Sequence, residues 1–238
     1  MKHRSITGTI WYTSRKPERM GERRGVEHFR FTRHGDGAIT LRAYCEIEEP
    51  APTVLRDVVY SLDPNGRPVD CMIRLTVGDR FMGSGWIRFA EGMVECESYG
   101  PSIGRISQRI EIDAPLDGFG THPIVADGYL LSRLTFELGQ RRTLRLMVPS
   151  PDHRGATPPL LAHVRIDAVY LGQETISVRA GTFAARRYRF VDDGGGSGFS
   201  SEHPPYELWI SDDEDGIFLQ GGVDGYMQTW YELAVLDR

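Results

Sequence analysis

The side chains best suited to acid–base chemistry lie on irregular segments between strand-like runs. Asp152-His153-Arg154-Gly155 is one such segment, and His122 and His203 lie on two others. Imidazole serves as a general acid or base near neutral pH, and a guanidinium group can hold a carboxylate or a developing enolate. In this scheme His153 or His203 abstracts a proton, while Arg154 and a tyrosine hydroxyl stabilise the anion. The candidate catalytic residues are His122, His153, Arg154, His203 and Tyr226.

Each of these residues also has a structural interpretation. Asp152 and Arg154 could instead order a long loop through hydrogen bonds from side chain to backbone. His122 precedes a proline and could cap a helix start. Two prolines follow His203, and this extended segment either presents the imidazole or stiffens a sheet edge. The Tyr226 hydroxyl could be satisfied in the core, so the sequence leaves both interpretations open.

Aromatic side chains give a second signal. An aromatic-lined cavity would suit a planar or lipid-like ligand, whereas the alternative is an ordinary barrel core. Tyr226 and Gln228 would share one strand face if side chains alternate. The candidate ligand-binding residues are Trp86, Tyr129, Tyr206, Trp209, Gln228 and Trp230.

Arginines within strand-like runs give a third signal. On the outer face of a sheet they are solvent residues, and we expect this placement for all four and for the short basic run Arg23–Arg24. An arginine facing inward would need a carboxylate partner or an anionic ligand, because burying an unpaired charge is costly. The four arginines are Arg42, Arg56, Arg74 and Arg88.

The elements that must position these residues are β-hairpins. Residues 38–47 alternate between apolar and polar side chains, and Asp36-Gly37 before them is a hairpin turn signal. Similar runs predict a β-meander of about eight strands over 4–112. A loop and one short helix over 113–138, with Asp127 as the candidate N-cap, would separate it from a second β-rich half over 142–237.

The predicted fold is therefore all-β and mainly antiparallel: a β-barrel, or a curled half-barrel meander, with one short helix in a single domain over 1–238. Glycines in Met82-Gly83-Ser84-Gly85-Trp86 suggest a bulge or bend of the kind that curls sheets. The predicted ladder is interrupted near 113–135, 150–160 and 192–205. Most candidate catalytic residues fall in these three interruptions, which is where rigid scaffolds carry binding and catalytic groups.

One phrase resembles a known group of proteins. Val178-Arg179-Ala180-Gly181-Thr182-Phe183, followed by an alternating strand, is similar to a family of uncharacterised bacterial β-proteins. These are related in shape to the half-barrel carriers of lipoproteins and lipids, and the resemblance covers 122–191. It implies a curved antiparallel sheet that wraps an apolar cavity with one helix packed into it, and it implies no catalytic residues.

Composition limits the partners and the location. The chain of 238 residues has a net charge of -5, which argues against nucleic acid as a partner. Cys45, Cys71 and Cys96 match no zinc or redox spacing and read as buried apolar residues. No apolar segment follows the first residues and no run is long enough to span a membrane, so we expect a cytoplasmic protein. No phosphate-binding loop, nucleophile elbow or paired-histidine metal motif is present in the sequence, so we expect no cofactor and no metal.

Two functional hypotheses remain at this point. The first is the binding of a small apolar or aromatic molecule in a lipocalin-like cavity. The second is a cofactor-independent lyase, isomerase or hydrolase that acts on a small aromatic or lipid-like substrate by His, Arg and Tyr acid–base chemistry. An open half-barrel would also leave sheet edges that allow a homodimer.

Overall fold

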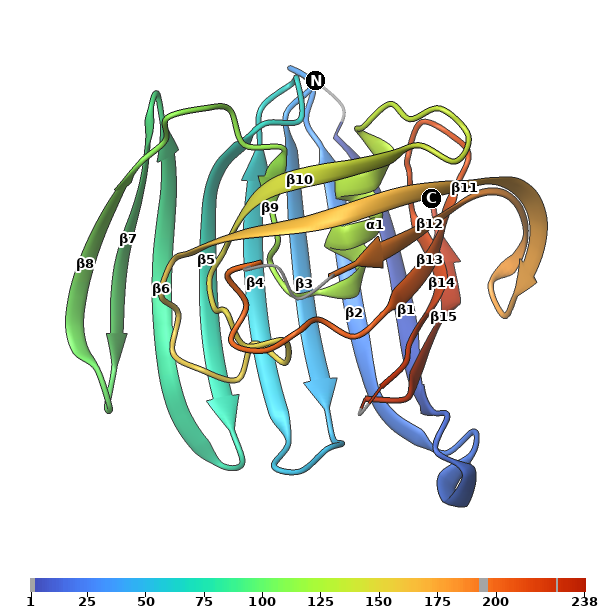
Figure 1. Ribbon diagram of the computed structural model, residues 1–238, viewed down its shortest axis with the longest axis horizontal. Coiled ribbons are helices and arrows are strands. Elements are labelled where there is room, and N and C mark those ends of the chain that lie inside the picture. Colours follow the sequence, from blue (N-terminus) through green and yellow to red (C-terminus); the bar gives the residue numbers. More distant parts are fainter. Residues whose placement is uncertain (1–2, 193–196, 226) are drawn as a thin grey trace.

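The computed structural model describes residues 3–192, 197–225 and 227–238. These residues form a fifteen-stranded sheet with the order β8-β7-β6-β5-β4-β3-β2-β1-β15-β14-β13-β12-β11-β10-β9. All neighbouring strands are antiparallel except β9 and β10, which are parallel. The sheet curls without closing, and β8 and β9 are its two edges (Figure 1). The predicted curled half-barrel is confirmed.

The first eight strands form the predicted meander, in which each strand pairs with the next. Gly37, with φ of 91°, completes the expected turn between β2 and β3. A short 3-10 helix over Pro17–Arg19 separates β1 from β2. The strands are β1 (Arg4–Ser14), β2 (Arg23–Arg33), β3 (Ile39–Ile47), β4 (Val54–Leu62), β5 (Pro68–Val77), β6 (Arg80–Ala90), β7 (Met93–Gly100) and β8 (Gly104–Glu111).

The second half begins with a two-residue strand and the helix α1 (Ile124–Ser132). The last strand, β15, pairs with β1 and so joins the two halves into one sheet. No helix in the described ranges is both long and apolar enough to cross a bilayer. The strands are β9 (Gly118–Phe119), β10 (Arg141–Val148), β11 (Ala162–Val178), β12 (Gly181–Val191), β13 (Tyr206–Ser211), β14 (Phe218–Val223) and β15 (Thr229–Asp237).

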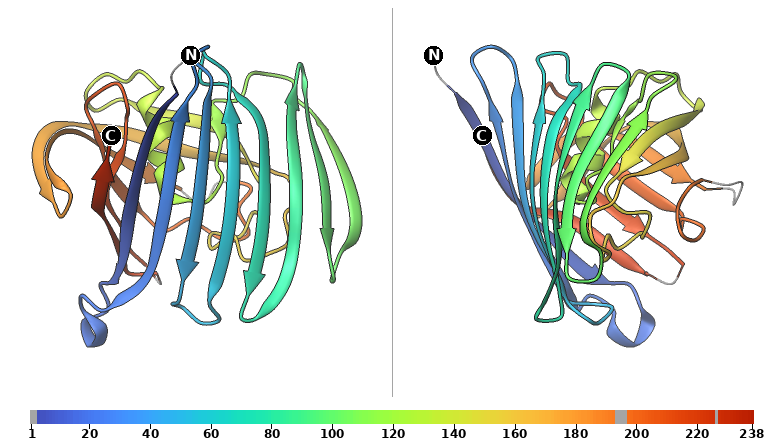
Figure 2. Two further views of the ribbon diagram at one scale, coloured as in Figure 1. Left: turned by 180° about the vertical axis from the view of Figure 1, so that it is seen from behind. Right: turned by 90° about the vertical axis from the view of Figure 1, so that its left-hand side faces the viewer.

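Alternation of side chains builds the core on the concave side of the sheet. In β3, Ile39, Leu41, Ala43 and Cys45 are buried, and Arg42 between them is exposed. The cysteines, which we expected to be small buried residues, are all buried and free. The first strands form one wall and β10 to β13 the opposite wall, and α1 lies between the two (Figure 2).

The helix packs against β13 and β14 and starts earlier than predicted. Its N-cap position is Pro123, and Asp127 lies inside the helix, so the prediction of Asp127 as the N-cap is wrong. The first backbone N–H groups are satisfied from another strand: Glu27 on β2 accepts hydrogen bonds from Ile124 (2.8 Å) and Val125 (2.9 Å). A distant carboxyl group therefore replaces the local cap.

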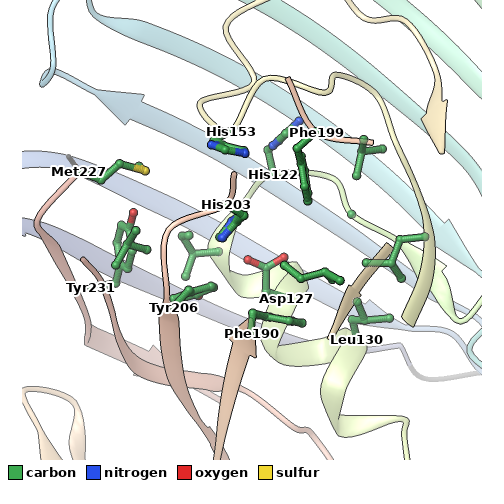
Figure 3. Close-up of a pocket in the computed structure, with 16 residues that line it drawn as sticks. His122, Asp127, Leu130, His153, Phe190, Phe199, His203, Tyr206, Met227 and Tyr231 are labelled. Atoms are coloured by element: carbon green, nitrogen blue, oxygen red, sulfur yellow. The ribbon is translucent and has the colours of Figure 1, made fainter. Parts of the chain in front are cut away.

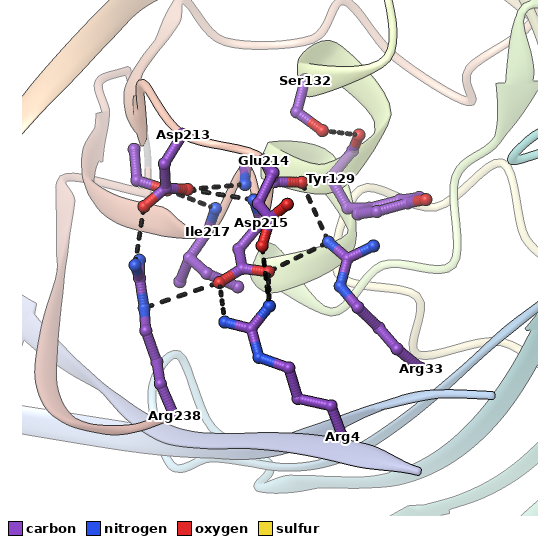
Figure 4. A network of polar contacts seen from close by, with 11 residues as sticks. Arg4, Arg33, Tyr129, Ser132, Asp213, Glu214, Asp215, Ile217 and Arg238 are labelled. Atoms are coloured by element: carbon purple, nitrogen blue, oxygen red, sulfur yellow. Dashed lines mark hydrogen bonds and ion pairs between the residues drawn. The ribbon is translucent and has the colours of Figure 1, made fainter. Parts of the chain in front are cut away.

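A polar cluster ties the β13–β14 connection to the start and end of the chain (Figure 4). The buried Asp215 carboxylate forms ion pairs with Arg4 (2.8 Å) and Arg33 (3.1 Å), and its oxygen is 3.8 Å from Arg238. Asp213 pairs with Arg238 at 2.7 Å. These contacts hold β1 and β2 against the opposite half of the sheet.

The arginines within strands do not all face solvent. Arg42, Arg74 and Arg88 are exposed as expected, but Arg56 is only 2 % exposed and faces inward. Arg24 is also 2 % exposed, so the prediction of a solvated Arg23–Arg24 run is wrong for its second residue. The register of β1 with β2 shifts beside Arg24, and this β-bulge turns the side chain into the core.

Candidate functional site

A cavity of about 100 Å³ lies inside the curl of the sheet, between α1, the strands of the second half and the loops that enter the concave side (Figure 3). Strand and helix residues make most of it apolar, and histidines and one acid give it a polar side. Its lining residues are Gly120, His122, Ile124, Asp127, Leu130, Leu146, Val148, His153, Ile166, Phe190, Phe199, His203, Tyr206, Val223, Met227 and Tyr231.

The three interruptions of the ladder meet at this cavity. The rings of His153 and His203 are in edge contact with centroids 4.9 Å apart, and Phe199 contacts both at 5.0 and 5.4 Å. His122 approaches the same place and hydrogen-bonds the Ser150 carbonyl oxygen at 3.2 Å. Three of the predicted catalytic residues, His122, His153 and His203, therefore line one cavity.

Burial keeps the histidines neutral. Burial and the charge of Arg56 lower the pKa of His122 to about 3, and burial and the neighbouring His153 lower the pKa of His203 to about 4. Because a carbonyl oxygen only accepts, the 2.7 Å contact to the Pro204 oxygen assigns the proton of His203 to Nδ1. Its Nε2 then carries a lone pair that can accept a proton or a hydrogen bond.

His122 has the opposite tautomer and a strained backbone. Its Nε2 donates to the Ser150 oxygen, which leaves the lone pair on Nδ1. Its φ of 73° is unusual for a residue other than glycine, and such conformations concentrate at functional sites. With this backbone conformation the His122 ring lines the cavity immediately before the start of α1.

Asp127 adds an acid to the apolar side of the cavity. Its carboxyl group projects from α1 into the cavity (Figure 3), and no hydrogen bond or ion pair reaches it from the described residues. Burial, together with the nearby Glu27, raises the pKa of Asp127 well above its usual range. A protonated Asp127 can donate a hydrogen bond, as can the buried Tyr206 hydroxyl, which has no partner in the described part of the chain.

Arg154 lies at an adjoining cavity rather than at the main one. This second cavity, of about 50 Å³, shares His122, Ile124, His153, Met227 and Tyr231 with the first. Arg154 does not point a free guanidinium group at the histidines, because its Nη2 donates to the carbonyl oxygens of Pro50 and Pro52. Asp152 orders the same loop by accepting from the backbone of Arg154 and Ala156. The hydrogen bonds of Asp152 and Arg154 therefore order the loop, as the structural interpretation of this segment predicts.

The fold has a counterpart among solved structures. A β-barrel-like protein of the domain of unknown function DUF1849 from Brucella abortus matches 99 % of this chain and 96 % of its own, with TM-score 0.62 and 13 % sequence identity. This chain has that β-barrel-like fold. A DUF1089 family protein from Pseudomonas aeruginosa is a weaker match, with TM-score 0.44 and 13 % identity over 85 % of this chain and 90 % of that one. No protein-family model and no curated protein matches the sequence.

The resemblance to uncharacterised bacterial β-proteins is thus confirmed for the β-barrel-like fold. At 13 % identity the comparison shows the fold alone and assigns no activity. Within the described ranges, no three His, Cys, Asp or Glu side chains are arranged to hold a metal ion.

Most of the aromatic residues predicted to bind ligand lie elsewhere. Tyr206 lines the cavity, but Trp86 is 41 % exposed on the outer face of β6, because it is out of phase with the buried Ile87. Tyr129 is buried on α1 against Phe31, away from the cavity lining. Trp209 donates to Glu174.

Two other residues that we predicted to bind ligand, Trp230 and Gln228, lie in or next to β15. Trp230 packs against Arg15 and Trp209, and Gln228, at φ of 43°, offers its carbonyl oxygen to the Arg15 backbone. Neither residue lines the cavity. Tyr226, the predicted phenolic acid, lies outside the described residues.

Several lining residues had no strong sequence signal. Phe190 and Tyr231 follow ordinary strand alternation, and only the curl of the sheet brings them together. The interpretation of Asp127 as an N-cap hid its place in the cavity. The parity of β4 could have revealed Arg56, which is in phase with the buried Val54 and Val58.

Proposed function

We propose that the cavity between α1 and the second half of the sheet binds a small, mainly apolar or aromatic molecule. The convergence of the three loops on a cavity with apolar walls and a few unpaired polar groups supports this proposal. His203 Nε2 would accept a hydrogen bond from the ligand, and Asp127 and the Tyr206 hydroxyl would donate. With the adjoining cavity of about 50 Å³, the cavity of about 100 Å³ reaches the volume of about 150 Å³ that holds benzene in another protein, so the fit is to a molecule with a single ring.

Filling the cavity tests the proposal. Ligand-observed NMR should detect binding of toluene to the unchanged protein. Val148→Phe places a ring in the cavity from β10 and should abolish this binding. The matched control is Val235→Phe, at a position on the outer face that is 55 % exposed, and it should bind as before. Equal binding by both variants, each with a cooperative thermal transition, would contradict the proposal.

A second candidate function is a cofactor-independent lyase, isomerase or hydrolase. It is favoured by the pairing of a protonated acid, Asp127, with a neutral base, His203, in one cavity. The base would take a proton from a carbon acid, and the acid would donate to the oxygen that gains charge. The unchanged protein should then accelerate deuterium exchange at the α-carbon of phenylacetone in D₂O, and His203→Gln should not. Equal rates with and without protein would rule out this carbon acid as a substrate.

We propose a cytoplasmic protein that binds a small molecule and does not bind nucleic acid. A homodimer would use the free edge of β8, where exposed Arg105 and Glu111 lie at opposite ends of the strand. Sedimentation analysis tests the dimer directly.

A further inference from the structure

Three arginines gather around the smaller of the two adjoining cavities. Arg24 and Arg56 are buried on the concave side of β2 and β4, and Arg154 enters from the loop before β11. This cavity shares a wall of His122 and His153 with the apolar cavity. A single ligand could therefore occupy both, with one end beside the arginines.

The three guanidinium groups bond only to backbone carbonyl oxygens in the described part of the chain. Arg24 donates to the oxygens of Glu49, Met227 and Gln228. Arg56 donates through Nη2 to the oxygens of Arg154 and Gly155. Arg154 donates through Nη2 to Pro50 and Pro52, and its buried Nε has no partner.

No carboxylate among the described residues forms an ion pair with these arginines. Glu49, on the wall of the cavity, attracts Arg24 without forming an ion pair with it, and its carboxylate is shared with Lys16 (2.8 Å) and Arg19 (2.5 Å). Glu27, the other nearby acid, is occupied by the Tyr12 hydroxyl and the first backbone N–H groups of α1. The cluster therefore carries excess positive charge.

Excess buried positive charge is costly unless an anion compensates it. We propose that this end of the cavity binds the carboxylate of a small organic acid whose apolar body occupies the larger cavity. The inference deepens the proposed ligand-binding function and depends on it. The two cavities, of about 100 and 50 Å³, together match the volume of about 150 Å³ that holds a benzene ring in another protein, so they suit a single-ring aromatic or a short aliphatic carboxylate.

Benzoate and benzamide test the inference because they share shape and size and differ in charge. Dissociation constants from ligand-observed NMR should show benzoate binding at least about tenfold more tightly than benzamide. Arg56→Gln should bring the two affinities within about twofold of each other. The matched control, Arg42→Gln, changes an exposed arginine on the neighbouring strand and should keep the preference.

The outcomes separate the two proposals. Equal binding of benzoate and benzamide by the unchanged protein would overturn the anion site and leave the apolar-binding function standing. Binding of neither molecule, nor of toluene, would overturn both. Tighter binding of inorganic phosphate than of benzoate would overturn the choice of an organic acid. If Arg56→Gln does not fold, Arg154→Gln takes its place, since Arg154 lies on a loop rather than within the core sheet.

Discussion

His153 and His203 meet edge to face with ring centroids 4.9 Å apart, although they belong to different loops. Burial, and after it the charge that His153 can carry, lowers the pKa of His203 to about 4. In the unfolded chain a histidine titrates near about 6.5, so the unfolded state takes up this proton first as the pH falls. Acidification below that value therefore costs folding stability.

Replacing His203 with Gln should remove part of this acid sensitivity. A change in pKa from about 6.5 to about 4 corresponds to a loss of about 2 kcal/mol of unfolding free energy between pH 7 and pH 4.5. Urea unfolding of both proteins at several pH values measures the difference. The exposed His28→Gln is the control and should follow the unchanged protein, and identical pH profiles for His203→Gln and the unchanged protein would contradict the prediction.

Asp127→Asn should stabilise the protein at alkaline pH. The folded-state pKa of Asp127 is raised, so folding of the unchanged protein loses stability as the pH rises from about 4 toward the folded value. The asparagine amide does not ionise, so the variant avoids this loss. We expect its unfolding free energy to exceed that of the unchanged protein by more than about 1 kcal/mol at pH 8, and the difference to shrink toward pH 4. Thermal unfolding at the two pH values checks the trend. A variant that is less stable at pH 8 would show that the ionised carboxyl group contributes favourably.

Gly155→Ala should distort the wall between the two cavities. An added Cβ would lie 2.6 Å from Arg56 Nη2 and 2.7 Å from the His122 ring, and φ is 55°. Gly139→Ala is matched for positive φ, at 75°, but its Cβ would meet no atom within 4 Å. Both variants force a side chain into a backbone conformation that glycine adopts freely. Gly155→Ala should therefore lose about 1–3 kcal/mol more unfolding free energy than Gly139→Ala in chemical denaturation, and this difference measures the crowding at Gly155. Equal losses would mean that the loop moves aside.

Asp215→Asn should loosen the junction between the two halves of the sheet. The buried carboxylate holds Arg4 and Arg33, and the loss of charge-assisted hydrogen bonds should cost about 2 kcal/mol of unfolding free energy. The neighbouring substitution Glu214→Gln changes a side chain that is 81 % exposed. It should lower the unfolding free energy by less than about 0.5 kcal/mol. If the two variants lost similar amounts of unfolding free energy, the burial of Asp215 would add nothing to the stability that its ion pairs provide.

The strands and their turns could be predicted from the sequence, because side-chain alternation and the backbone preferences of glycine are local signals. Ile39 to Cys45 show the period of two directly, and Asp36-Gly37 marks its turn. The same alternation in β4 places Arg56 on the buried face with Val54 and Val58. Strand alternation therefore predicts a buried Arg56, whereas the general preference of arginine for solvent predicts an exposed one, and the alternation is the better guide.

The site depended on information that is not local. Arg24 turns inward because a bulge shifts the register of β1 and β2, and such a shift leaves no clear sequence mark. Tyr231 and Phe190 reach one cavity only because the sheet curls. Trp86, in contrast, looked like a ligand contact by composition, although its place in the alternation of β6 puts it outside. Residue type alone was a poorer guide to the site than strand parity.

The hydrogen bonds from Ile124 and Val125 to Glu27 span nearly a hundred residues of chain. The helix that presents Asp127 consequently has no complete N-terminus until the first wall of the sheet exists to receive it. Contacts of such long sequence separation carry a high loop-closure cost and form only with the whole topology. A fragment of either half would thus lack the site, and ligand occupancy would report on the integrity of the entire molecule.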